Sequence, residues 1–259
     1  MKKTLLLGAL FAVVGAAQAQ NPFTLVDGNS IVRGDADSGL LVDWETDGTD
    51  HLFNQDYYFR VGNTAEKAVW DGVSGMVTTI APNIVNVAYA HTGFMIDITY
   101  TLIGGTPGSG TSDIGEIVRI RNRSNGALDF HLFEYDDFDI GGTAGGDFAS
   151  LVNSSTIEQH ENPYYAMVGS TPPFDHFEIS AWPSLLSKLT DGVADNLSDG
   201  AVSAGPADLA FGMQWDRTIA AGGTFVMSKN KRVETVPEPG TIAALGLGAL
   251  VLIRRRRSK

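Results

Sequence analysis

The sequence predicts an all-β protein, folded as an antiparallel β-sandwich of the jelly-roll or supersandwich type. The first observation is a strict apolar/polar alternation over residues 94–102, the side-chain period of a strand with one buried face. The second is that clusters of Gly, Asn, Asp and Pro separate such runs at short intervals. The third is that residues 20–235 contain no long run with a 3.6-residue apolar period, so we expect very little helix.

The predicted strands combine alternating apolar side chains with turn-forming residues at their ends. They are residues 56–61, 75–80, 84–90, 94–102, 114–123, 128–135, 155–160, 164–168, 174–179, 209–216 and 224–232. Residues 183–189 are the one expected helix, because Pro183 suits a first helical turn.

Two pairs of these strands are predicted to form β-hairpins, namely 114–123 with 128–135 and 209–216 with 224–232. A two-residue Asn-Gly loop in the first hairpin would mix charged and apolar side chains on one face. We therefore expect a three-residue loop in which Gly126 has a positive φ.

The N-terminal residues have the pattern of a secretory signal peptide. Two lysines at positions 2 and 3 precede an apolar run over residues 5–17, and Ala17-Gln18-Ala19 is a small-x-small cleavage pattern. We expect the export machinery of the Sec pathway to translocate the chain and signal peptidase to cut after Ala19. Gln20 would then be the first residue of the mature protein.

The C-terminal residues combine three ordered parts. Pro237-Glu238-Pro239 cannot continue a helix or a central strand, so the folded domain is expected to end before them. An uncharged apolar segment follows, with residues 240–253 as the predicted transmembrane helix. These 14 residues span roughly 21 Å as a helix, short of a hydrocarbon core of roughly 30 Å. A basic cluster that resists crossing the bilayer comes last: Arg254, Arg255, Arg256 and Arg257.

In order and spacing, this tail resembles the PEP-CTERM sorting signal. The resemblance implies a Gram-negative bacterium and an exosortase, the membrane enzyme that processes such tails. It also implies transient anchoring in the inner membrane, followed by release to the cell surface or the extracellular polysaccharide matrix. A C-terminal anchor that is never cut is the alternative. The resemblance covers residues 236–259 and leaves the predicted β-sandwich domain, residues 20–235, unassigned.

The composition of the predicted mature domain excludes several functions. Without the two terminal segments it has 11 basic and 29 acidic residues, a net charge of −18. Such a charge argues against a nucleic-acid partner, because phosphates require Lys and Arg. The chain contains no cysteine, which excludes disulfides, thiol catalysis and cysteine-based zinc sites.

An acidic, glycine-rich segment after residues 128–135 is a candidate calcium site. Its predicted ligands are Asp136, Asp137, Asp139 and Asp147, with Gly141-Gly142 between them. Carboxylate oxygens are the ligands that calcium prefers. The spacing matches no standard calcium loop, so a solvated acidic turn is the alternative reading.

The remaining side chains indicate no catalytic residues. Five scattered histidines lack metal-ligand spacing, and arginines 119, 121 and 123 on one strand face are expected to pair with carboxylates of neighbouring strands. No nucleophile, phosphate-binding or dinucleotide motif is present. We therefore expect an exported structural, adhesive or glycan-associating protein. A polysaccharide lyase or hydrolase on a supersandwich is the alternative.

Overall fold

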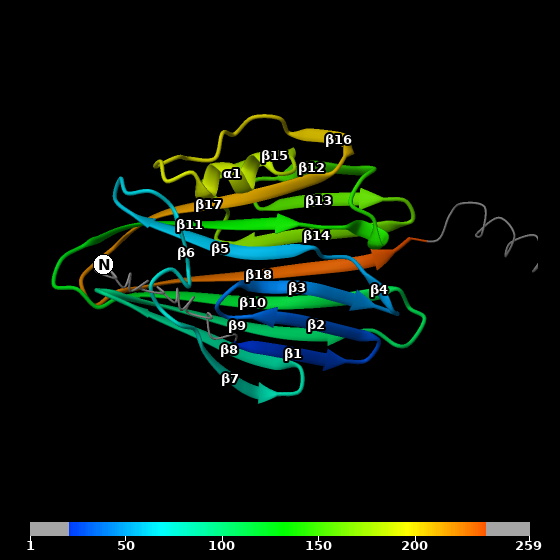
Figure 1. The fold of residues 1–259 in the computed structure, drawn as a ribbon, viewed down its shortest axis with the longest axis horizontal. Coiled ribbons are helices and arrows are strands. Elements are labelled where there is room, and N and C mark those ends of the chain that lie inside the picture. Colours follow the sequence, from blue (N-terminus) through cyan, green and yellow to red (C-terminus); the bar gives the residue numbers. More distant parts are fainter. Residues whose placement is uncertain (1–20, 237–259) are drawn as a thin grey trace, which may run out of the picture.

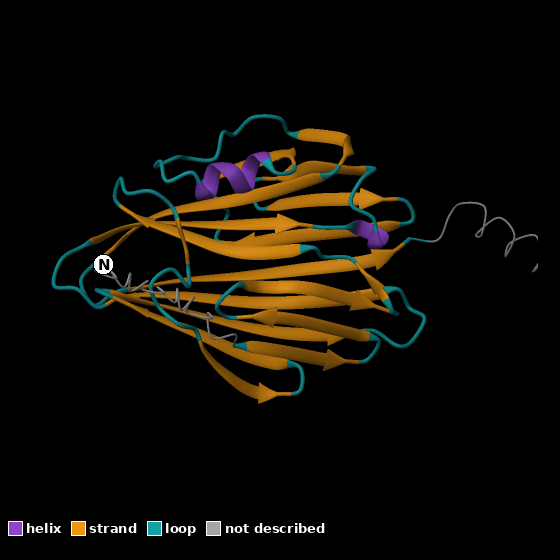
Figure 2. Cartoon of the chain, viewed as in Figure 1, coloured by secondary structure: helices purple, strands orange, loops and turns teal. Residues whose placement is uncertain are grey.

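The computed structural model describes residues 21–236, which form two antiparallel β-sheets stacked as a sandwich (Figure 1). Strands dominate this region, and its only helices are short (Figure 2). These are α1 (Ser184–Thr190), which confirms the predicted helix, and the 3₁₀ turn η1 (Ile140–Gly142). The predicted β-sandwich is confirmed.

The first sheet has the strand order β1-β2-β3-β5-β11-β17-β15, with β4 paired to β3 and β6 paired to β5. Its strands are β1 (Pro22–Asp27), β2 (Ser30–Asp35), β3 (Gly39–Thr46), β4 (Thr49–Asp50), β5 (Asn54–Val61), β6 (Lys67–Ala68), β11 (Leu128–Asp137), β15 (His176–Ala181) and β17 (Leu209–Ile219).

The second sheet has the order β16-β12-β13-β14-β18-β10-β9-β8-β7. Its strands are β7 (Met76–Ala81), β8 (Ile84–His91), β9 (Phe94–Gly104), β10 (Thr111–Asn122), β12 (Asp147–Asn153), β13 (Thr156–Glu161), β14 (Tyr164–Thr171), β16 (Ser203–Ala207) and β18 (Thr224–Thr235).

Sequence periodicity missed β1, β2 and β3 in the first sheet, together with the two-residue strands β4 and β6, and it missed β12 and β16 in the second. For β2 and β3 the structure shows a reason. Strand β3 begins with three consecutive buried residues, Gly39, Leu40 and Leu41, so alternation is absent at its start. The pairing of β2 with β3 shifts between Arg33 and Asp35, where a bulge interrupts the alternating register.

Both predicted hairpins are wrong. Strand β10 pairs with β9 and β18 in the second sheet, whereas β11 pairs with β5 and β17 in the first. Strands β17 and β18 are likewise in different sheets. The connections 123–127 and 220–223 therefore cross between the sheets. The predicted buried face of Val118, Ile120, Phe130 and Leu132 is present, but the two strands meet across the core instead of side by side.

The crossing from β10 to β11 is held by Asn122. Its side-chain amide donates hydrogen bonds to the carbonyl oxygens of Gly126, Ile219 and Ala220, at 2.8, 2.9 and 3.1 Å. The crossing thus relies on a buried side chain, and Gly126 does not have the positive φ that we expected.

The core lies between the sheets and contains large aromatic side chains, including Trp44, Trp215 and Phe130, all fully buried. A smaller apolar cluster lies on the outer face of the first sheet, where α1 packs against it. Its buried residues are Tyr58, Phe133, Tyr135, Leu185, Leu189, Leu197 and Ala210. Strand β11 contributes to both clusters through alternate residues.

The bulge between β2 and β3 gives a test of the packing. A Cβ atom added at Gly34 would lie 1.9 Å from the carbonyl oxygen of Leu40, whereas one added at Gly126 meets nothing within 4 Å. We expect Gly34→Ala to lower the free energy of unfolding by about 1–3 kcal/mol, the typical cost of overpacking. Gly126→Ala is the control and should leave stability nearly unchanged. Urea denaturation measures both, and equal stabilities for the two variants would contradict the observed bulge.

Candidate functional site

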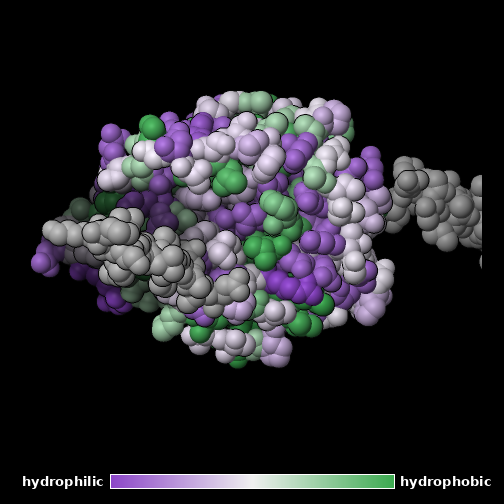
Figure 3. Space-filling model, viewed as in Figure 1, coloured by the Kyte–Doolittle hydropathy of each residue, from purple (hydrophilic) through white to green (hydrophobic). Residues whose placement is uncertain are grey.

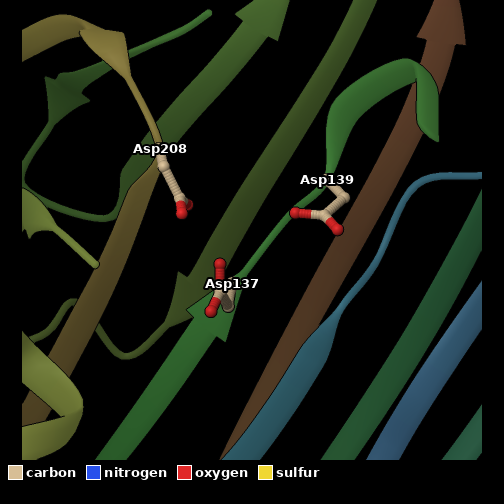
Figure 4. Close-up of side chains that lie close together, drawn as sticks. All are labelled: Asp137, Asp139 and Asp208. Atoms are coloured by element: carbon tan, nitrogen blue, oxygen red, sulfur yellow. The ribbon is translucent and has the colours of Figure 1, made fainter. Parts of the chain in front are cut away.

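Three carboxylates converge where strand β11 ends. Asp137 is its last residue, Asp139 follows on the way to η1, and Asp208 comes directly before β17. One oxygen from each side chain lies within 4.8 Å of the others. Figure 4 shows the three side chains pointing toward one space between their elements. The hydroxyl of Tyr135, two residues earlier on the same strand face, donates a 2.7 Å hydrogen bond to Asp137.

A pocket of about 200 Å³ lies over this acidic cluster. Besides the three aspartates, its lining includes Ala144 and two aromatic side chains, Phe53 and Trp182. Phe53 is 57% exposed and Trp182 is 47% exposed, unusual values for such large apolar residues. On the face shown in Figure 3, apolar side chains form several separate patches among polar ones. The pocket thus brings aromatic surfaces and carboxylates together.

Two aspartates of this cluster, Asp137 and Asp139, have raised pKa values. The pKa of Asp137 is raised to about 6, mainly by burial; the hydrogen bond from Tyr135 opposes this shift, and the nearby carboxylates of Asp208 and Asp139 add to it. Burial followed by repulsion from Asp208 also raises the pKa of Asp139. These shifts follow from placing like charges together where little water reaches them.

The four predicted calcium ligands separate in the structure. Asp137 and Asp139 lie together as expected, but Asp136 does not join them. Because side chains alternate along β11, Asp136 points between the sheets and forms a buried ion pair with Lys231. Our assignment of Asp136 to the same site is therefore wrong.

Asp147 is buried beside the cluster. Burial is the main cause that raises its pKa to about 7, against a 2.7 Å hydrogen bond from Gln159 to Oδ2. The charges of Glu161, Asp139 and Asp208 raise the pKa by smaller amounts. Its other oxygen, Oδ1, has no hydrogen-bond partner among residues 21–236.

Sequence reasoning missed Asp208, because it lies far along the chain from Asp139 and no local motif surrounds it. It also missed two histidines, His131 and His176, which share one carboxylate on the outer face of the first sheet. Nδ1 of His131 lies 2.5 Å from Asp216, and Nε2 of His176 lies 3.4 Å from the same carboxylate. Burial alone would raise the pKa of Asp216, but hydrogen bonds from Gln214 and His131 hold it below its usual value.

The arginine stripe differs from our expectation. Arg119 lies opposite Asp97 in the strand register, yet within residues 21–236 neither Arg119 nor Arg121 forms an ion pair. Arg123 instead approaches the sulfur of Met95 at 2.8 Å.

The predicted processing residues lie outside the described region. These are Ala17, Ala19, Gln20, Pro237, Glu238, Pro239 and the four terminal arginines, together with the predicted transmembrane segment 240–253. Within residues 21–236, no helix has the length and apolar character needed to span a bilayer.

Comparison with known families identifies the motif in the C-terminal tail. The family model of the PEP-CTERM protein-sorting motif matches residues 235–257. The chain carries a PEP-CTERM sorting motif. The match includes the Pro-Glu-Pro triplet and the arginine cluster, and it confirms the predicted exosortase substrate. A PEP-CTERM signal implies Sec export, so the protein is exported.

The sandwich is similar in fold to several solved structures, although no curated protein sequence matches the chain. A protein described as a putative aldose 1-epimerase, from Escherichia coli K12, has 10% identity and a TM-score of 0.61, with 84% of this chain and all of that chain covered. A galactose mutarotase-like protein from Lactobacillus casei has 7% identity and a TM-score of 0.57, with 83% of this chain and 100% of that chain covered. A bacterial glucoamylase complexed with acarbose has 9% identity and a TM-score of 0.62, over 90% of this chain and 36% of that one. These likenesses show the fold alone.

The raised pKa of Asp137 predicts how stability depends on pH. This carboxyl binds its proton more tightly in the folded state, with a pKa of about 6, than at its ordinary pKa of 3.8. Its stabilising contribution is therefore complete below about pH 4 and is lost as the pH rises to about 6. Asp137→Asn cannot ionise but can still accept the hydrogen bond from Tyr135. At pH 7 we expect the variant to have a free energy of unfolding about 1 kcal/mol higher than wild type. In a domain of this size, that difference raises the melting temperature by about 2–4 °C.

Thermal melts from pH 4 to pH 8 in a chelating buffer measure this effect. The advantage of the Asn variant should shrink to nothing near pH 4. The control is Asp129→Asn, which removes a carboxylate that is 64% exposed on the same strand. An advantage of Asp137→Asn that is constant with pH, or equal for both variants, would contradict the proton affinity assigned to Asp137.

Proposed function

We propose that the exported domain binds polysaccharide of the cell surface or extracellular matrix in the pocket between Phe53 and Trp182. Exposed aromatic side chains next to a pocket mark a binding site, because burying them against a ligand removes apolar surface from water. Sugar rings have apolar faces that stack on such side chains, and their hydroxyls bond to carboxylates. This pairing of aromatics with Asp137, Asp139 and Asp208 is the observation that carries the proposal.

A calcium ion would suit this pocket as part of the binding site. Three carboxylates repel one another when ionised, and a divalent cation relieves that repulsion. Calcium takes six to eight oxygens, so positions would remain for water or sugar hydroxyls. We place Asp137, Asp139 and Asp208 in direct contact with the ion. Asp147 is buried close by, and its Oδ1 has no hydrogen-bond partner within residues 21–236. A bound cation would stabilise this oxygen as well.

In this proposal the sorting signal directs the domain to the cell surface or the extracellular matrix. The signal peptide would bring the domain across the inner membrane, and the C-terminal segment would hold it there until exosortase releases it. The released domain would carry a strongly acidic surface, which favours neutral glycans or cation-bridged contacts over other polyanions.

The second candidate function is a polysaccharide-active enzyme. It is favoured by the pKa of Asp137, since a carboxyl that titrates near 6 can act as a proton donor beside an ionised carboxylate. The two functions differ in product, because an enzyme releases new sugar ends and a binding domain does not.

Co-sedimentation with insoluble polysaccharide from the native host tests the proposal. We expect Phe53→Ala and Trp182→Ala each to weaken binding about tenfold, equivalent to about 1.4 kcal/mol. Phe148→Ala is the control, because Phe148 is 42% exposed but lies outside the pocket. Binding should also fall in a calcium chelator.

Three outcomes separate the alternatives. Loss of binding in both pocket variants but not in the control supports the proposal. Release of reducing or unsaturated sugar ends by wild type, abolished by Asp137→Asn, identifies an enzyme instead. Binding that all three aromatic variants retain would show that the pocket is not the binding site.

A further inference from the structure

A cluster of five charged side chains lies between the two sheets, in the interior of the sandwich. We call it the buried charge cluster. Its members are Glu116 on β10, Glu134 and Asp136 on β11, and Lys229 and Lys231 on β18, and each side chain is fully buried. The two lysines and Glu116 come from the second sheet, whereas Glu134 and Asp136 come from the first. The cluster therefore joins the two layers of the sandwich.

Lys231 is at the centre of this cluster. Its Nζ donates a hydrogen bond to Oδ1 of Asp136 and lies 2.9 Å from Glu134 and 3.2 Å from Glu116. The other oxygen of Asp136, Oδ2, has neither a hydrogen bond nor an ion pair within residues 21–236. A buried carboxylate oxygen without a partner is costly, because it loses its hydration and gains nothing in return.

We propose that Lys231 and Asp136 condense to form an intramolecular amide bond that cross-links the two sheets. A bond forms between Nζ of Lys231 and Cγ of Asp136, and the bond from Cγ to one carboxyl oxygen breaks. That oxygen leaves as water with two protons from Nζ. An ammonium and a carboxylate thus become one neutral amide and one water molecule. Nothing is oxidised or reduced, so no co-reactant is needed.

The reacting pair is already in hydrogen-bond contact. Attack on the carboxyl carbon starts from an uncharged amine and a protonated carboxyl, which the ion pair yields when one proton moves from Nζ of Lys231 to Asp136 along their hydrogen bond. Condensation removes two buried charges and the unpartnered oxygen together. Lys229 and Glu134 remain as an ion pair with each other.

Glu116 is placed to carry the proton. Its Oε1 is the atom 3.2 Å from Nζ of Lys231, and its Oε2 accepts a 2.6 Å hydrogen bond from the hydroxyl of Tyr57. Glu116 can take a proton from Nζ and give it to the departing oxygen, while Tyr57 fixes its orientation. The charge of Glu116 also acts on Asp136, as expected for neighbours.

The contacts favour Lys231 over the other lysine. Lys231 contacts the carboxylate of Asp136 and a separate carboxylate that can act as proton carrier. The one ion pair of Lys229 within the described residues is with Glu134. In an exported chain without cysteine, an amide between positions 136 and 231 would supply the covalent link that a disulfide gives other secreted proteins.

The mass of the exported protein under denaturing conditions tests this proposal directly. With its two ends first located by tandem mass spectrometry, the chain should be lighter than its sequence by one water molecule. Protease digestion should yield one branched peptide that joins the segment of Asp136 to the segment of Lys231. A mass equal to that of the unmodified sequence would overturn the proposal, and this measurement needs no variant.

Four variants test the assigned roles. Lys231→Arg keeps the charge but should restore the full mass, whereas Lys229→Arg should still lack one water. Asp136→Asn should condense with loss of ammonia instead of water. Glu116→Gln should leave the full mass, because it cannot carry the proton. A water loss that disappears in Lys229→Arg but persists in Lys231→Arg would refute the assigned pair, and normal condensation in Glu116→Gln would refute the role of Glu116.

Discussion

The ionic contact between the two sheets is the constraint on which the rest of the structure depends. Lys229 and Lys231 of β18 meet Glu134 and Asp136 of β11 across the core, and all four side chains are fully buried. A charge left unpaired there would be strongly destabilising, so β11 and β18 can pack in only one register. Because side chains alternate along β11, the same register presents Tyr135 and Asp137 to the outer face. The register of strand β11 therefore fixes the positions of the buried charges and of the pocket residues together.

Burial disfavours the charged form of each of these groups, and neighbouring charges modify that effect. Burial, followed by the positive charge of Lys231, lowers the pKa of Lys229 well below its usual range. Burial alone would raise the pKa of Glu116, but Lys231 and then Lys229 hold it below its usual value. Burial raises the pKa of Tyr57 far above its ordinary range, so its hydroxyl remains a donor to Glu116. The core thus holds three acidic and two basic side chains in mutual contact.

The sequence predicted the strands well and their partners poorly, for a physical reason. Alternation shows which face of a strand is buried, and residues 94–102 revealed β9 in this way. It does not show which strand lies alongside, so consecutive strands such as β10 and β11 were paired when they belong to different sheets. The same limit applies to the site. Asp137 and Asp139 were found because they are adjacent in sequence, whereas Asp208 reaches them only through the fold.

The central claim is that the end of β11 forms a cation-dependent sugar site. A crystal structure of the exported domain, grown with terbium in place of calcium and soaked with an oligosaccharide of the host polysaccharide, tests it most directly. The account predicts one anomalous peak bounded by Asp137, Asp139 and Asp208, with a sugar ring against Trp182. A sugar bound elsewhere on the domain, or a pocket without the cation while the sugar is bound, would contradict it.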